Sequence, residues 1–297
     1  MKPDAGRLHV IAERDVGLFS LLQQVIANVP WAVAEGRVPV ADFRSRTCYW
    51  TPNGHRGRST VWEYYFEPLI PRYPTERIPG GLRERISAEP PSAFEVGYAA
   101  AGGSFVSCHF GDHADLSGAT LPIPYEWDDP GERLRREAKK VLNRYVRPRP
   151  HIQRAVSSFW EKYLAGHHVI GVHVRGTDAV SSQEVRPHRQ GSLLLDRYLV
   201  ELQRRLEVTP AAKVFVASDQ ESSVALLRAE FPGRVIAYNS VRHSDGDPAG
   251  QGPTGWLMPA YITGDRDRAA RNGEEAVIEY LLLSRCDDLV HNGSSLA

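Results

Sequence analysis

Polar side chains gather in three short clusters in the second half of the chain, each directly after an apolar segment. The clusters contain His173, Arg175 and Asp178, then Ser218 and Asp219, and finally Ser294 and Ser295. An arginine guanidinium forms paired hydrogen bonds with phosphate oxygens. Serine hydroxyls and backbone N–H groups at a helix start bind the same kind of anion, and a carboxylate accepts hydrogen bonds from a base or a ribose. These residue types therefore predict a site for a nucleoside diphosphate.

The apolar segments before these clusters have the pattern of an alternating β/α domain. Strands are predicted at 168–174, 214–217, 234–238 and 288–291, and helices at 194–206, 221–231 and 274–284. Ser218 and Glu221 match a capping box that opens the second of these helices. In an open parallel sheet, ligands bind beyond the carboxyl ends of the strands. The three polar clusters are therefore expected to share one site.

The first half of the chain opens with a βαβ pattern, which favours a parallel sheet. Its strands are predicted at 8–11 and 38–40, and its helix at 18–29, ending near Pro30. The aromatic run 61–66 is interpreted as core, with a cleft wall as the alternative.

Two prolines in the run 147–150 interrupt helix and sheet alike. The chain is accordingly predicted to divide into two domains. The first domain is expected to span residues 1–150 and the second residues 151–297.

Composition excludes several classes of protein. Of the 297 residues, 42% are apolar and 24% charged, as in soluble globular proteins. Lys+Arg and Asp+Glu are both 36, so no net charge draws the chain to nucleic acid or to a membrane surface. The first residues lack a signal-peptide pattern, and no stretch approaches the roughly 18 apolar residues of a membrane span. We expect a cytoplasmic protein without nucleic-acid or membrane partners.

Motifs of other enzyme classes and of metal sites are missing from the sequence. It contains no G-x-G-x-x-G, P-loop, H-E-x-x-H or G-x-S-x-G motif. Its three cysteines are widely spaced and odd in number, which indicates neither a disulfide framework nor a zinc cluster. Asp245 and Asp247, like Asp265 and Asp267, have D-x-D spacing, but each pair lies in a hydrophilic stretch typical of a solvated turn. No metal is predicted.

The clusters resemble the three donor-site motifs of a fucosyltransferase superfamily. The stretch 170–178, IGVHVRGTD, looks like the first motif of α-1,6-fucosyltransferases, nodulation-type chitin-oligosaccharide fucosyltransferases and protein O-fucosyltransferases. The stretch 214–219 is similar to their second motif, and 274–295 resembles the third. Residues 15–20 stand where these enzymes carry a glycine-containing loop after the first strand. The order and spacing of the motifs over 168–295 carry the resemblance.

The resemblance implies a GT-B fold, an α/β architecture of two Rossmann-like domains facing a central cleft. Residues 1–150 would be the acceptor-side domain and residues 151–297 the nucleotide-sugar-binding domain. It also implies an inverting, metal-independent transfer of L-fucose from GDP-fucose, without a cofactor, to a hydroxyl of a bacterial glycan or natural product. The donor-binding residues would be Gly17, His173, Arg175, Ser218, Asp219, Ser294 and Ser295. Among them, His173 and Asp219 would contact the guanine, the two final serines would bind the diphosphate, and Gly17 would let its loop approach the sugar.

Arg175 is the main catalytic candidate, because a preorganised cation stabilises the charge that develops on the leaving diphosphate. For the base that takes the acceptor's proton, the candidates are Asp15, Glu13 and Asp178. Asp178 is equally consistent with a structural cap of the turn after its strand.

Two departures from the family pattern favour different hypotheses. Gly176 stands where many relatives carry a second arginine, which favours transfer of another sugar, such as a heptose or hexose, from a nucleotide diphosphate donor. The chain ends at Ala297, immediately after the third motif, which leaves two interpretations: the C-terminal domain is a shortened form, or an equivalent closing helix comes from elsewhere. A non-catalytic nucleotide-sugar-binding module and a structural α/β protein are two further hypotheses for the whole chain.

Overall fold

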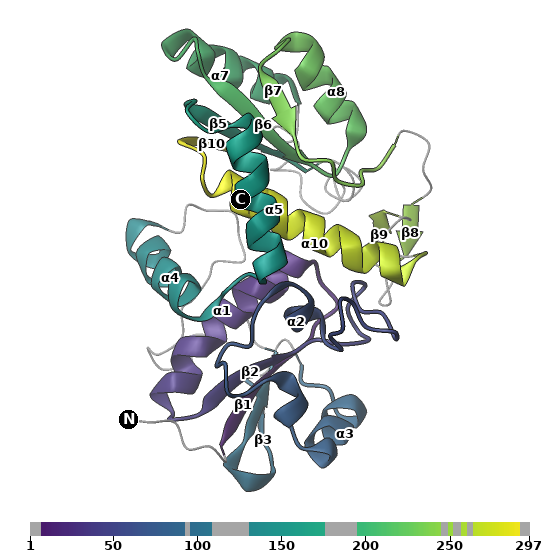
Figure 1. Cartoon of the computed structure of the whole chain (residues 1–297). Coiled ribbons are helices and arrows are strands. Elements are labelled where there is room, and N and C mark those ends of the chain that lie inside the picture. Colours follow the sequence, from purple (N-terminus) through teal and green to yellow (C-terminus); the bar gives the residue numbers. More distant parts are fainter. Residues whose placement is uncertain are drawn as a thin grey trace. The chain divides into compact units, whose positions relative to one another are not determined.

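The computed structural model describes residues 7–92, 96–108, 131–175, 195–244, 249–251, 257–259 and 264–291. The chain divides into two compact units, Met1–Arg149 and Pro150–Ala297, which we call the N-terminal unit and the C-terminal unit (Figure 1). Each has its own mainly parallel sheet, so each is described by itself.

The sheet of the N-terminal unit has the strand order β2-β1-β4-β3. Its strands are β1 (Leu8–Ala12), β2 (Val38–Asp42), β3 (Tyr98–Ala99) and β4 (Phe105–Ser107). The first three in this order run parallel, and β3 pairs antiparallel with β4. Helix α1 (Leu18–Ala34) joins β1 to β2, which confirms the predicted βαβ opening.

Helix α1 continues past the proline at which it was predicted to end. Pro30 lies inside the helix, and the buried stripe runs on through Ala32. Proline removes its own N–H from the helix and its ring crowds the carbonyl oxygen four residues earlier, but packing of the apolar face stabilises the remaining turn. The helix ends at Ala34, and Gly36, two residues further on, has a φ of 65°, in the left-handed region that glycine favours.

Shorter elements complete the N-terminal unit. They are α2 (Val61–Tyr65), the 3-10 helix η1 (Thr75–Arg77), α3 (Gly80–Ala88), the 3-10 helix η2 (Ala101–Gly103) and α4 (Gly131–Tyr145). Every residue of α2 is buried, which confirms that the aromatic run belongs to the core. The face of the sheet opposite α1 packs against Ile78 and Leu82, from the η1–α3 segment.

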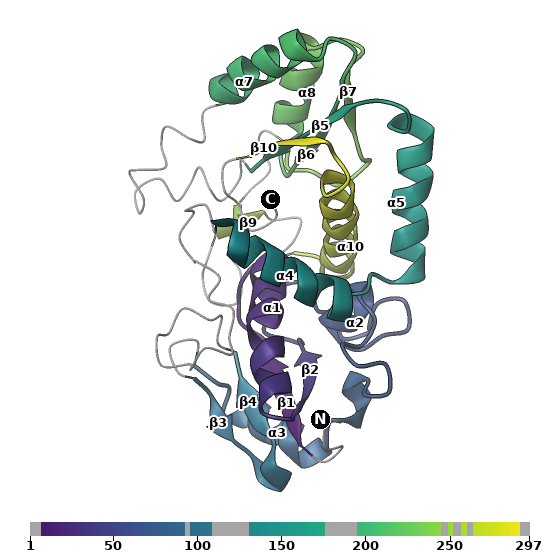
Figure 2. The ribbon, with the colours of Figure 1, turned by 90° about the vertical axis from the view of Figure 1, so that its left-hand side faces the viewer.

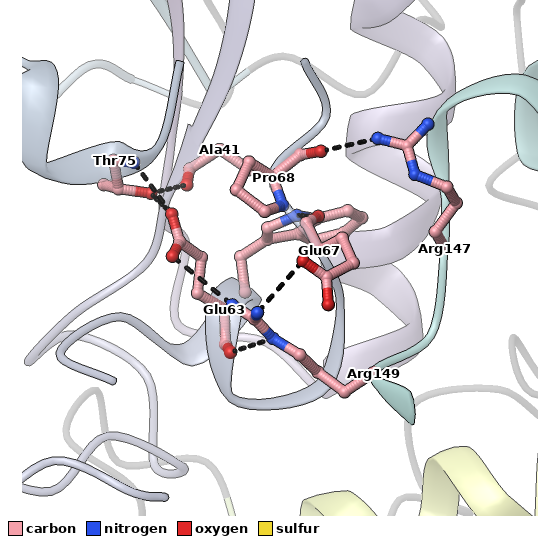
Figure 3. Close-up of polar contacts among 8 residues, drawn as sticks. Ala41, Glu63, Glu67, Pro68, Thr75, Arg147 and Arg149 are labelled. Atoms are coloured by element: carbon pink, nitrogen blue, oxygen red, sulfur yellow. Dashed lines mark hydrogen bonds and ion pairs between the residues drawn. The ribbon is translucent and has the colours of Figure 1, made fainter. Parts of the chain in front are cut away.

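A buried polar network fixes the last residues of the N-terminal unit (Figure 3). Arg149 donates from Nε to the carbonyl oxygen of Glu63 at 3.0 Å and from Nη1 to Oε2 of Glu67, also at 3.0 Å. On its other side, the Glu63 carboxylate accepts from both the N–H and the hydroxyl of Thr75, at 2.8 and 2.7 Å. The segment that leads to Pro150 is therefore anchored to α2.

The sheet of the C-terminal unit is wholly parallel, with the order β10-β5-β6-β7. Its strands are β5 (Val169–Val174), β6 (Lys213–Ser218), β7 (Val235–Ala237) and β10 (Asp288–His291). Its helices are α5 (Pro150–Tyr163), α7 (Leu195–Val208), α8 (Glu221–Glu230) and α10 (Arg266–Leu283). A separate antiparallel pair is formed by β8 (Ala249–Gln251) and β9 (Leu257–Pro259). The alternating β/α pattern is confirmed.

The two faces of this sheet carry different helices, with α7 and α8 on one side and α5 and α10 on the other (Figure 2). Ile170, Val172 and Val174 pack into the core formed with α7 and α8. On the other face, a Cβ added to Gly171 would lie 3.0 Å from Sγ of Cys286, just beyond α10. Glycine at this position lets the strand and the end of α10 pack closely.

Two helix starts differ from the prediction. Helix α8 begins at Glu221 with Gln220 as its N-cap, and Ser218 forms no capping box. Helix α10 begins at Arg266, well before the predicted start at residue 274, because the Asp265 side chain accepts the N–H groups of the first turn.

The described helices include none that is both long and apolar enough to cross a membrane.

Candidate nucleotide-binding site

The carboxyl ends of β5, β6 and β10 lie at one edge of the C-terminal sheet, and two of the predicted clusters meet there. In the strand register, His173 on β5 is opposite Ala217 on β6 and His291 on β10. Val174 is opposite Ser218, so Arg175 and Asp219 directly follow neighbouring strand ends. The structure thus brings His173, Arg175, Ser218 and Asp219 together. Asp178, Ser294, Ser295 and also Gly176 lie outside the described residues.

His173 is a buried, neutral histidine with an unused nitrogen. Its side chain is 5% exposed, and Nδ1 has no hydrogen-bond partner among the described residues. Burial lowers the pKa of His173 to about 3, and the nearby Arg175 and His291 add to this effect. A buried polar nitrogen is normally hydrogen-bonded. Its position at the edge of the sheet therefore favours a ligand contact.

Arg175 supplies positive charge at the same edge. It follows His173 by two residues at the end of an extended strand, so the two side chains are expected on the same face. The influence of Arg175 on the pKa of His173 is consistent with this placement. Arg175 is partly exposed, as a residue that meets a soluble anion must be.

The turn after β6 is stabilised by the Ser218 hydroxyl and by backbone hydrogen bonds to His243, which follows β7. Ser218 is buried, and its Oγ accepts the N–H of Gln220 at 3.1 Å. The carbonyl oxygen of Asp219 accepts the N–H of His243 at 2.8 Å, and the carbonyl oxygen of His243 accepts the N–H of Glu221 at 3.0 Å. The half-buried Asp219 side chain therefore sits on an ordered turn.

A buried ion pair that the sequence analysis missed anchors this region. The Arg242 guanidinium donates from Nε to the carbonyl oxygen of Ser218 at 3.1 Å and from Nη2 to that of Tyr238 at 2.6 Å. Nη2 also lies 3.1 Å from Oε1 of Glu279 on α10, which accepts the Ser240 hydroxyl at 2.6 Å. Burial raises the pKa of Glu279, while Arg242 and Ser240 lower it. The pair ties the segments after β6 and β7 to α10.

In the N-terminal unit, Gly17 is the N-cap of α1 at the carboxyl side of β1. Its φ of −60° and ψ of 154° suit any residue. No described atom lies within 4 Å of a Cβ built on it. Nothing in the described fold therefore requires glycine here, which fits the expectation that a ligand approaches. The half-buried Asp15 belongs to the same turn.

Glu13, one of the three candidate bases, binds the backbone of the segment that follows β2. Its carboxylate accepts the N–H of Arg44 and, at 3.1 Å, that of Arg46. Burial raises the pKa of Glu13, whereas these two backbone contacts lower it. Because its oxygens bind the backbone, Glu13 has a structural role, and Asp15 is the better-placed carboxylate of this turn.

Among the described residues, no three His, Cys, Asp or Glu side chains are grouped so that they could hold a metal ion. Of the two D-x-D pairs, Asp245 and Asp247 lie outside the described residues. Asp265 of the other pair accepts the N–H groups of Asp267 and Arg268, both at 3.0 Å, and is a helix cap.

Known structures share the fold of this chain, although no family model matches its sequence. Fucosyltransferase NodZ from Bradyrhizobium matches 98% of this chain and 91% of its own, with a TM-score of 0.53 and 18% identity. POFUT1 in complex with GDP-fucose matches 99% and 93%, with a TM-score of 0.51 and 13% identity. FUT1 from Arabidopsis thaliana, in complex with GDP, matches 98% and 67%, with a TM-score of 0.51 and 14% identity. The chain has the GT-B fold of these fucosyltransferases, as the motifs predicted.

Proposed function

We propose that this chain is a glycosyltransferase that uses a nucleotide-sugar donor, GDP-fucose in particular. The observation that carries the proposal is the edge of the C-terminal sheet, where Arg175 and the buried His173 neighbour the Ser218–Asp219 turn. These groups suit a diphosphate, a base and a ribose. NodZ and POFUT1, which share the fold, were solved with GDP-fucose.

In the proposed reaction, an acceptor hydroxyl oxygen attacks the anomeric carbon of the fucose from the face opposite the leaving group. The bond between that carbon and the β-phosphate oxygen breaks, its electrons stay with GDP, and the anomeric configuration inverts. Arg175 stabilises the charge that develops on the β-phosphate, because a fixed cation acts most strongly where charge appears. This scheme needs no metal ion, since Arg175 supplies the positive charge.

The other donor contacts are assigned by residue type and motif. His173 and Asp219 bind the guanine, supported by the ordered turn and by the unused nitrogen of His173. Ser218 lies beside them, and Ser294 and Ser295 bind the diphosphate.

Asp15 is assigned as the base that accepts the proton of the acceptor hydroxyl, and Asp178 is the alternative base. Glu13 is set aside because its carboxylate accepts two backbone N–H groups. Gly17 leaves room for the donor sugar to approach the turn that carries Asp15. The acceptor is a hydroxyl group of a glycan or a natural product.

A donor panel tests the proposed function. Purified protein is incubated with GDP-fucose, GDP-mannose, a GDP-heptose, UDP-glucose and UDP-galactose, together with a mixture of oligosaccharide acceptors, and the released nucleotide is measured. We expect GDP release to be fastest from GDP-fucose and to require an acceptor. Faster release from another donor would change the assigned sugar, which is the hypothesis that Gly176 favours. Binding of GDP without release from any donor would instead identify a non-catalytic nucleotide-sugar-binding module.

A further inference from the structure

His291 is a residue of the donor edge that lies within the third motif stretch, 274–295, and has no role among the predicted donor contacts. It is the last residue of β10 and is opposite His173 in the parallel register of β10 and β5. Register partners in a parallel pair project from the same face of the sheet. The two imidazoles are therefore neighbours, and His291 is exposed whereas His173 is buried.

The charged groups that shift the pKa of His173 are basic. Arg175 and His291 both disfavour the charged form of His173, and burial lowers the pKa of His291 itself. The acidic residue of β10, Asp288, lies at the other end of the strand, where it pairs with His168 at 2.8 Å and Arg205 at 3.0 Å. His173, Arg175 and His291 thus lie at one edge of the sheet, where hydrogen-bond donors of this kind suit an anion.

We propose that His291 is a ligand of the donor's diphosphate and donates a hydrogen bond to a phosphate oxygen beside Arg175. This inference rests on the proposed function, because it adds a residue to the same donor site. A phosphate next to the imidazole favours its protonated form, so the contact becomes a charge-assisted hydrogen bond. His291 is the exposed member of the pair, so an incoming phosphate reaches it without rearrangement of the buried His173.

The test compares GDP with guanosine, which lacks the diphosphate, by calorimetric titration of the full chain. The variant is His291→Gln, and the matched control is His168→Gln, a histidine of the same sheet at the opposite end of β5. We expect His291→Gln to weaken GDP binding about tenfold or more and to leave guanosine binding unchanged. His168→Gln is expected to alter neither, and His291→Arg to restore most of the affinity for GDP.

Each outcome separates the inference from the proposed function. If the wild type binds no GDP, the proposed function fails. If the wild type and His291→Gln bind GDP equally well, only the role of His291 fails, and an equal loss of GDP and guanosine affinity also contradicts it. Should His291→Gln not fold, titration of inorganic pyrophosphate into the wild type decides, because the imidazole NMR signals of His291 must shift if it contacts phosphate.

Discussion

His173 and His9 show how burial, rather than a charged partner, determines the state of a side chain. His9 is fully buried in the N-terminal unit, where its ring packs edge-on against Trp31 and Nε2 lies 3.3 Å from Oδ1 of Asn28. Burial lowers the pKa of both histidines to about 3. Both are therefore neutral at physiological pH and can act only through hydrogen bonds. For His173, this suits contact with a base better than contact with a phosphate.

Because both histidines are buried and neutral, we predict that the free energy of unfolding decreases in acid. Histidine in an unfolded chain titrates near pH 6.5, so between pH 6.5 and 3 the unfolded state binds protons that the folded state does not. The free energy of unfolding should therefore be unaffected by these two residues above pH 6.5 and fall as the pH drops. Each histidine should account for about 2 kcal/mol at pH 5.

Urea unfolding of the wild type and His173→Gln at pH 7.5, 6 and 5 measures the effect of His173. We expect a smaller dependence on pH in the variant, and His168→Gln serves as an exposed control. Identical pH dependence in His173→Gln and the wild type would show that His173 is not the neutral buried group described here.

Gly17 is a residue for which the proposed function and the fold make different demands. Its backbone angles suit alanine, and a Cβ would meet no described atom within 4 Å. We expect Gly17→Ala to change the free energy of unfolding by no more than about 1 kcal/mol, because lost N-cap preference and reduced unfolded-state entropy oppose each other. The rate of sugar transfer should nevertheless fall at least tenfold, because the added methyl group would occupy the space of the donor sugar.

Gly80→Ala is the matched control for this experiment, since Gly80 also begins a helix with open space around its Cβ position. It should leave both stability and transfer nearly unchanged. Unchanged transfer in Gly17→Ala would contradict the assignment of this turn to the donor sugar.

At the scale of elements, the proposed donor site depends on the contacts that fix the segments after β6 and β7. Arg242 is buried, with 6% of its side chain exposed, and contacts three carbonyl oxygens as well as Glu279 and Glu221. Removing one partner of a buried pair leaves an uncompensated charge, so Arg242→Ala should lower the free energy of unfolding by about 3–5 kcal/mol. GDP affinity should fall with it, because the carbonyl of Ser218 loses its donor.

The double variant Arg242→Met with Glu279→Leu separates stability from positioning. An apolar pair of similar volume often restores the stability of a buried ion pair, but it cannot bind the carbonyl oxygens of Ser218 and Tyr238. Recovery of stability is therefore expected in urea unfolding without full recovery of GDP affinity in calorimetry. Full recovery of both would show that the pair has no positioning role.

Elements with local sequence signals were predicted well. The strands β5 and β6 are largely apolar runs, β10 contains the apolar pair 289–290, and each is followed by a polar cluster, so their carboxyl ends could be located before their partners were known. The start of α10 was missed because its first residues are polar, and the spacing of Asp265 and Asp267 is as typical of a solvated turn as of a helix cap. The predicted end of α1 at Pro30 was wrong, because packing of the apolar face carries the helix beyond it.

At the scale of the whole molecule, the contacts between distant residues could not be predicted. Arg242 and Glu279 are 37 positions apart, and Glu13 binds backbone groups more than 30 positions away. Contacts between two such distant residues have no periodicity or characteristic spacing in the sequence from which they could be predicted. Three motifs in fixed order did predict the fold, because together they specify which strand ends meet.

The central claim is that the edge formed by β5, β6 and β10 binds a nucleoside diphosphate through Arg175. Calorimetric titration of GDP into the wild type and Arg175→Ala tests it most directly, with Arg204→Ala as control because Arg204 forms a surface ion pair with Glu201. We predict that GDP binds the wild type and Arg204→Ala equally and binds Arg175→Ala at least tenfold more weakly, because a charge-assisted phosphate contact is lost. Equal affinity in all three proteins, or no binding of GDP to the wild type, would contradict the account.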